Sequence, residues 1–175
     1  MKSYRLLFLL PLICFLTACP YSSAFKVGEP QEIDNIQWDG TWISSRIENG
    51  KMIKDELIFK KSGKQVMNVN TAFHVLRSDR SSKLKLKGYP VKIGGQNWLL
   101  LYNPKRNSDK KYMYLGYEFS ASNTLLLKIL SDTKVPEDLT SPTALEAWIL
   151  ANQKDSGIWE DTLQFQRLGY LEKKP

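Results

Sequence analysis

The chain has little of the chemistry on which enzymes and metal sites depend. Its 175 residues include two cysteines and one histidine, His74. A zinc site normally takes several His and Cys ligands, which this chain cannot supply. A Ser–His–Asp triad would have to use His74, but no Gly-x-Ser-x-Gly elbow accompanies it. The sequence also has no Asp-x-Asp-x-Asp-Gly calcium loop and no Gly-rich phosphate-binding loop. We therefore expect no catalytic residues, no metal and no bound cofactor.

Both cysteines lie near the amino terminus, within or just after an apolar run. Residues 6–16 are almost continuously apolar and follow two basic residues, Lys2 and Arg5. This run has the length of a signal-peptide core and is too short to cross a bilayer, which needs about 20 apolar residues. Cys14 lies inside the run and would be removed with it, so we expect no disulfide in the mature chain.

The leader ends in Leu16-Thr17-Ala18-Cys19, which resembles the lipobox of bacterial lipoproteins. The resemblance implies that residues 1–18 are a signal peptide and that Cys19 becomes the first mature residue, with a covalent lipid on its thiol. Two or three acyl chains give a stable membrane anchor, whereas one does not. By the same resemblance, Pro20 in place of an Asp favours the outer membrane, facing the periplasm, over the inner membrane. The alternative is an ordinary signal peptide with a chance cysteine.

The segment after the leader is polar before any apolar pattern begins. Residues 19–37 contain Pro20, Gly28 and Pro30 and show no sustained period. We therefore expect a lipidated N-terminus and a flexible tether that reaches at most roughly 60 Å. Removal of the leader with Lys2 and Arg5 leaves 23 basic and 18 acidic residues, and this net charge of +5 favours anionic surfaces such as lipid headgroups. A secreted lipoprotein meets little nucleic acid, so we expect none as a partner.

From Trp38 onward, apolar residues recur with a period of two between turn signals, which is typical of an all-β barrel or sandwich. We expect one domain over residues 38–170, of a mainly β (β-rich α+β) class. The predicted strands cover residues 40–47, 55–61, 65–77, 83–87 with an extension to 93, 97–103, 111–120, 124–130 and 162–168. Eight antiparallel strands can close into a barrel that is filled or holds one small ligand. The alternative is an open, strongly curved sheet.

One helix is predicted between the seventh and eighth strands. Ser141 is a good N-cap and Pro142 suits the first helical position. Leu145 and Ile149 follow with helical spacing, and the pattern ends near Lys154. Because the strands within residues 97–130 carry apolar residues on both faces, their outer side needs a cover. We expect the helix to provide it.

The start of the domain, Gly40-x-Trp42, resembles the opening strand of lipocalins and related calycins. That resemblance implies a calycin-like barrel with an interior suited to a hydrophobic ligand. The chain departs from the lipocalin pattern in one respect, because lipocalins carry their main helix after the eighth strand.

The chain is rich in aromatic residues, which supply both apolar surface and polar tips. If several face the barrel interior they form a pocket for a hydrophobic ligand, and the candidate ligand-binding residues are Trp42, Trp98, Tyr102 and Tyr114. The alternative is a filled core. A basic loop with Lys105, Arg106, Lys110 and Lys111 is a second candidate surface, for anionic headgroups or a partner, although an ordinary solvated loop explains it equally simply.

These observations together predict a membrane-anchored lipoprotein of the bacterial cell envelope. We expect its domain to be a binding module for a small hydrophobic or amphipathic ligand. The alternative is a structural protein with a filled barrel that docks on an envelope protein.

Overall fold

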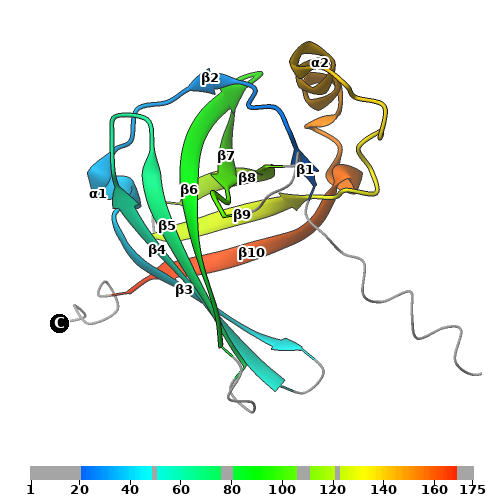
Figure 1. The fold of residues 1–175 in the computed structure, drawn as a ribbon. Helices are drawn as coiled ribbons and strands as arrows, with labels where there is room; N and C mark the ends of the chain where they lie inside the picture. Colours follow the sequence, from blue (N-terminus) through cyan, green and yellow to red (C-terminus); the bar gives the residue numbers. More distant parts are fainter. Residues whose placement is uncertain (1–20, 49–50, 76–80, 106–110, 121–122, 169–175) are drawn as a thin grey trace, which may run out of the picture.

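The chain forms a closed antiparallel β-barrel. A computed structural model describes residues 21–48, 51–75, 81–105, 111–120 and 123–168. The barrel strands are β3 (Gly40–Glu48), β4 (Lys51–Lys61), β5 (Met67–Val75), β6 (Ser81–Ile93), β7 (Gln96–Tyr102), β8 (Tyr112–Ser120), β9 (Thr124–Leu130) and β10 (Trp159–Arg167). Each pairs with the next along the chain, and β10 returns to β3 (Figure 1). The predicted mainly β class and the eight-stranded barrel are confirmed.

Several strands are longer than their local sequence predicts. β4 begins at Lys51 rather than near Asp55, and β6 runs without a break through Gly88. β10 begins at Trp159 rather than Thr162. In each case a neighbouring strand supplies backbone partners along the added length, as β3 does for β4 from Lys51. Pairing across the sheet therefore extends strands beyond the apolar alternation that identifies them.

The barrel interior is lined by alternate residues of every strand, as the pleat of a sheet requires. The buried interior cluster comprises Ile33, Trp38, Trp42, Leu57, Phe59, Met67, Val69, Leu86, Leu99, Leu101, Leu115, Leu125, Leu127 and Phe165. One end of this interior is filled by aromatic rings around the short helix α1 (Asn35–Trp38). The Trp38 ring lies 5.0 Å from that of Phe59 and 4.8 Å from those of Tyr117 and Phe119. The α1 end of the barrel is therefore packed.

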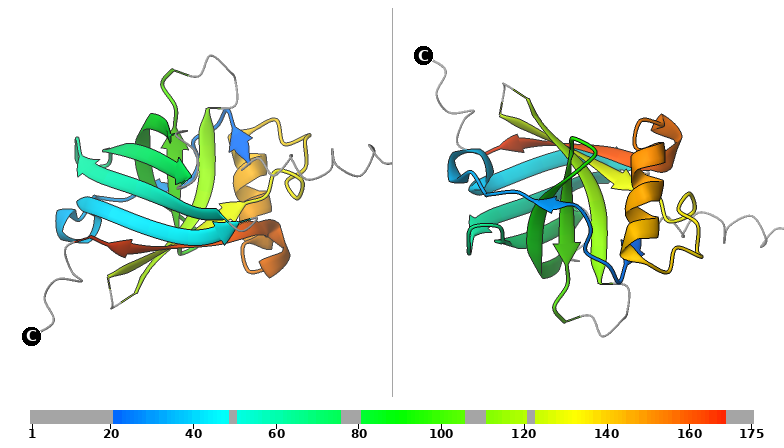
Figure 2. Two further views of the ribbon diagram at one scale, coloured as in Figure 1. Left: turned by 90° about the horizontal axis from the view of Figure 1, so that it is seen from below. Right: turned by 90° about the horizontal axis from the view of Figure 1, so that it is seen from above.

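A second core lies outside the barrel wall, over β6 to β9. Helix α2 (Pro142–Asn152) lies beside this wall (Figure 2). Its Leu145 and Ile149 are fully buried in one cluster with Trp98 and Leu100. The helix starts as predicted, because the Ser141 hydroxyl accepts a hydrogen bond from the Ala144 backbone N–H at 3.1 Å. The prediction that the helix covers an apolar outer face is confirmed.

The predicted flexible tether is wrong for residues 21–37, which pack on the barrel. β1 (Ser22–Ser23) pairs with β8 beside the place where β9 leaves it, and β2 (Glu29–Pro30) pairs with β6. Tyr21, Val27 and Ile33 are buried. The segment shows no apolar period because it contacts β8, then β6, and then the interior cluster through Ile33. Its apolar side chains are therefore buried at separate places rather than along one face. The folded domain therefore includes residues before the predicted boundary at residue 38.

Burial of Tyr117 predicts a loss of stability at alkaline pH. Desolvation raises the pKa of the Tyr117 hydroxyl from 10.0 to about 12. Between these values the unfolded chain loses a proton that the folded chain retains, so the free energy of unfolding falls as the pH rises above 10. In urea unfolding at a series of pH values, Tyr117→Phe should show a shallower alkaline decline than the unchanged protein. Equal slopes for the two proteins would contradict the prediction.

Candidate binding cleft at the barrel seam

The barrel is closed by a short seam between β3 and β10. The two strands are in register at Ile43 with Gln166 and at Trp42 with Arg167. The Leu168 backbone N–H also donates to the Thr41 carbonyl at 2.8 Å. Beyond Ile43 the strands diverge, since β3 follows β4 along its whole length whereas β10 follows β9. No described residue pairs with the facing edge of either strand past this point.

Arg167 stabilises the paired end of the seam, where Trp42 of β3 is in register with β10. Its guanidinium carbon lies 5.6 Å from the centre of the Trp42 ring, and a guanidinium nitrogen donates to the Asp39 carbonyl. Gly40 makes room for this side chain. A Cβ at Gly40 would lie 3.2 Å from Arg167 Nε, and the residue has a φ of +133° that L side chains rarely adopt. The strands are thus held together at one end and separate towards the other.

The divergence leaves a cleft of about 670 Å³ between the two strands. Its lining residues are Ile43, Ser44, Ser45, Asp161, Thr162, Leu163, Gln164, Gln166, Arg167 and Leu168. Apolar side chains of both strands, Ile43 and Leu163, lie among hydroxyl and amide groups. Such a mixed lining suits an elongated ligand with an apolar body and polar groups along it.

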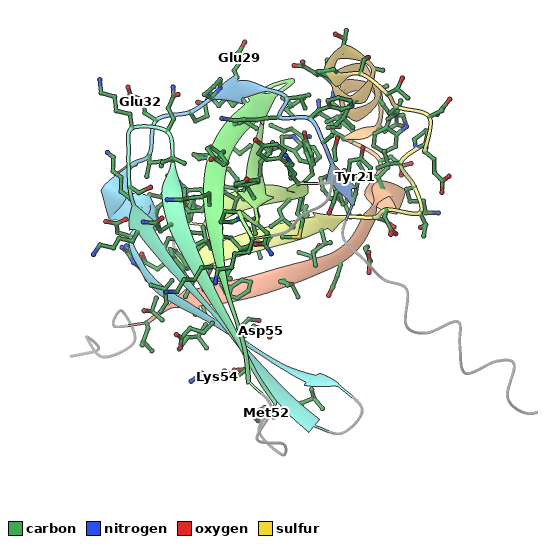
Figure 3. The ribbon with its side chains drawn as sticks, viewed as in Figure 1. Tyr21, Glu29, Glu32, Met52, Lys54 and Asp55 are labelled. Carbon is green, nitrogen blue, oxygen red and sulfur yellow. The ribbon has the colours of Figure 1, made fainter. Side chains whose placement is uncertain are left out.

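Polar groups are buried on the interior side of this cleft. Ser44 and Asp55 lie opposite each other on β3 and β4 and are 7% and 1% exposed. Asp55 shares the inward face of β4 with Leu57 and Phe59, and Figure 3 places it where β4 runs out from the barrel into its projecting hairpin. The barrel interior is therefore apolar at its α1 end and polar beside the open part of the seam.

The structure does not gather the four predicted ligand-binding residues around one pocket. Trp42 faces the interior, 1% exposed, and its indole N–H donates to the Trp38 carbonyl at 3.1 Å. Trp98 and Tyr114 belong to the outer core under α2, and Tyr102 is half-buried on the same outer face, 5.4 Å from the Tyr112 ring. The expected shared aromatic pocket does not form, because Trp98, Tyr102 and Tyr114 lie on the outer face of β7 and β8, whereas the alternate residues Leu99, Leu101 and Leu115 line the interior.

Tyr114 has a structural part in the outer core. Its hydroxyl donates to the Phe25 carbonyl at 2.7 Å, which ties the amino-terminal segment to β8. Burial raises the pKa of this hydroxyl well above its usual range. The side chain therefore stays neutral and holds residues 21–27 on the barrel wall.

The other residues singled out by the sequence contribute little to this cleft. His74 lies in β5, opposite Lys54 of β4. Because β4 separates β5 from β3, His74 does not border the seam. Cys19, Arg106 and Lys110 lie outside the described residues, while Lys105 and Lys111 are exposed at the ends of the β7–β8 loop. Within the described ranges, no three His, Cys, Asp or Glu side chains are placed to hold a metal, and no helix is long and apolar enough to cross a membrane.

Sequence reasoning missed the residues that line the cleft. Asp55, which does not line the cleft but lies opposite Ser44 on β4, carried a usable signal, since an acidic residue in step with Leu57 and Phe59 interrupts an apolar face. Ser44, Leu163 and Gln164 carried none, because their place depends on where two strands separate. No protein-family model, curated protein or solved structure matches this chain.

Proposed function

We propose that this protein is a membrane-anchored lipoprotein of the bacterial envelope whose barrel binds an amphipathic ligand in the seam cleft. The lipid on Cys19 would hold it to the outer membrane, facing the periplasm, and it would act by binding rather than by catalysis. The observation that carries the proposal is the separation of β3 from β10 beyond Ile43, which opens a cleft of about 670 Å³ in an otherwise closed barrel.

The packing limits where a ligand can lie. The α1 end is filled by Trp38, Phe59 and Phe119, so a ligand does not occupy that half of the barrel. At the seam, Ile43 and Leu163 offer apolar contact, and the exposed Ser45, Thr162 and Gln164 can hydrogen-bond polar groups. We therefore expect an elongated molecule with an apolar chain and hydrogen-bonding groups along its length.

A second candidate function is the docking of an envelope protein. The backbone edges of β3 and β10 along the cleft have no partner among the described strands. An extended peptide can add to such an edge through main-chain hydrogen bonds. The filled α1 end favours this alternative over a ligand enclosed in the barrel centre.

Native mass spectrometry separates the two candidates. A chain that begins at residue 20 is purified from a bacterial extract without detergent, and we expect a co-purified lipid or metabolite of defined mass. Ser45→Trp places a large ring in the cleft and should abolish this adduct. Ser62→Trp makes the same change at an exposed turn between β4 and β5 and should retain it.

The alternative outcomes are equally informative. An apo mass that persists after incubation with envelope lipids would reject the small-ligand proposal. A crosslinked protein partner that Ser45→Trp loses and Ser62→Trp keeps would then support peptide docking at the same cleft. An adduct that both variants retain would place the ligand elsewhere on the molecule.

A further inference from the structure

The outer wall of the barrel carries a surface of tyrosines and lysines next to the first described residue. We call it the tyrosine–lysine patch; its members are Tyr89, Tyr102, Tyr112, Lys26, Lys85, Lys87 and Lys111. The three rings lie together: the centre of the Tyr112 ring is 6.2 Å from that of Tyr89 and 5.4 Å from that of Tyr102. They are half-buried, at the end of the outer face of β6 to β8 that α2 leaves uncovered.

The lysines surround these rings. Lys26 Nζ lies 4.1 Å from the centre of the Tyr89 ring. Lys87 pairs with Tyr102 across β6 and β7, and its Nζ donates to Asn68 Oδ1 at 2.6 Å. Lys85 and Lys111 are exposed. Burial of the rings raises the pKa of Tyr89, which keeps its hydroxyl neutral. The patch therefore combines positive charge with aromatic rings that carry polar hydroxyl tips.

The amino-terminal segment fixes this patch close to the proposed lipid anchor. The Tyr21 backbone N–H donates to the Leu130 carbonyl at 2.8 Å, and Ser23 pairs with Tyr112. The Lys111 backbone N–H in turn donates to the Ser23 carbonyl at 2.8 Å. From Cys19 to Tyr21 is a step of two residues, which spans at most about 7 Å. Tyr21 lies opposite Tyr114, two residues along β8 from Tyr112, so a lipid on Cys19 would enter the bilayer near the β8 end of the patch.

We propose that the tyrosine–lysine patch lies on the bilayer surface against anionic phospholipid headgroups and holds the barrel in one orientation. The proposal rests on the lipid anchor of the proposed function. Tyrosine is suited to the headgroup region because its ring is apolar and its tip is polar. Lysines add attraction to anionic lipids over a distance of about one Debye length.

This orientation also determines the direction in which the seam cleft opens. In the cyclic strand order, β6 and β7 lie opposite the junction of β3 and β10. With the uncovered end of the outer face of β6 to β8 on the membrane, the cleft opens towards the aqueous compartment. A ligand or a partner peptide then approaches from solution rather than from the bilayer.

Lysine footprinting on the mature lipoprotein tests the orientation. The chain is purified from bacterial membranes, and its intact mass first establishes whether Cys19 carries lipid. Acetylation rates of individual lysines are then measured by mass spectrometry in three settings. These are detergent micelles, phosphatidylcholine vesicles, and vesicles of phosphatidylethanolamine with phosphatidylglycerol. We expect Lys26, Lys85 and Lys111 to react about five-fold more slowly in the phosphatidylglycerol vesicles than in micelles. Lys64, exposed in the turn after β4, and Lys154, exposed after α2, should be unchanged.

Matched variants test the role of charge. Lys26→Gln combined with Lys111→Gln should remove the protection of Lys85. Lys64→Gln combined with Lys154→Gln should preserve it. Protection of Lys85 in both double variants would overturn the proposal that these charges hold the orientation.

The remaining outcomes are distinct. A lipidated mass with equal reactivity of patch and control lysines overturns the orientation while the anchor stands. A mass without lipid overturns the anchored function and the orientation with it. Equal protection in both kinds of vesicle overturns the selection of anionic headgroups. Protection already present in micelles that rises with protein concentration assigns the patch to a second copy of the chain and overturns the membrane assignment.

Discussion

Replacing Trp42 with alanine is expected to lower the free energy of unfolding by about 3–5 kcal/mol. The side chain is 1% exposed inside the barrel, where its ring lies 5.7 Å from Phe119. It also supports the seam, because Arg167 lies over its ring and pairs with it in register. The substitution therefore leaves a cavity in the interior core and loosens the closure of β10 on β3. Urea unfolding followed by far-UV circular dichroism measures the loss.

Two variants separate these contributions. Trp42→Phe keeps an aromatic ring but loses the indole hydrogen bond to the Trp38 carbonyl, so a smaller loss is expected, of about 1–2 kcal/mol. Trp148→Ala removes the same side chain from a half-buried position on α2 and should also cost less than Trp42→Ala. A loss below about 1 kcal/mol for Trp42→Ala would show that the interior does not depend on this residue.

Replacing Ile149 with alanine is expected to cost about 2–5 kcal/mol, although the residue lies outside the barrel. Ile149 is 0% exposed in the outer core, whereas its neighbour Leu150 on the same helix is 46% exposed. Leu150→Ala should therefore change stability by less than about 0.5 kcal/mol. The two residues are neighbours near the end of the same helix, and their difference in helix propensity is only a few tenths of a kcal/mol, so a large difference reports burial. Similar small effects for both would mean that α2 is a dispensable attachment rather than part of the folded unit.

The sequence predicted those elements whose pattern is local and long. β9 covers residues 124–130 as predicted, because four leucines, an isoleucine and a turn before them specify a buried strand. Helix α2 followed from a cap at Ser141, a proline at the first turn and helical spacing of Leu145 and Ile149. Apolar residues on both faces of strands such as β7 also predicted that an outer layer exists. Local chemistry and tertiary packing agree at these positions.

The amino-terminal segment escaped prediction because its structure depends on distant partners. β1 and β2 have two residues each, too few to establish a period. Each fills a place beside a strand that another strand leaves free, β1 on β8 and β2 on β6. The prolines and the glycine in this segment suggested a flexible tether. In the structure Gly28, at φ +92°, lets the segment lie close to Val91 and Ile93, where a Cβ would not fit. Composition alone does not distinguish a flexible link from an ordered strap.

The candidate site was harder to predict than the fold. Alternation along β7 and β8 assigned residues to two faces but did not say which face was interior, so Trp98 and Tyr114 were assigned to a pocket they do not line. The seam cleft depends on the angle at which β10 leaves β3, and that angle is set by their separate pairings with β9 and β4. Neither strand carries a local signal of this divergence.

The short seam also bears on how the barrel forms. β3 comes early in the chain and β10 comes last, so their pairing has a large sequence separation and raises the contact order. A chain that emerges amino terminus first exposes the edge of β3 until the final strand arrives. Unpaired edges of this kind are sites of aggregation in folding intermediates. We therefore expect closure of the barrel to be a late folding step. We also expect removal of β10 to leave a chain with two open sheet edges that depends on chaperones to remain unaggregated.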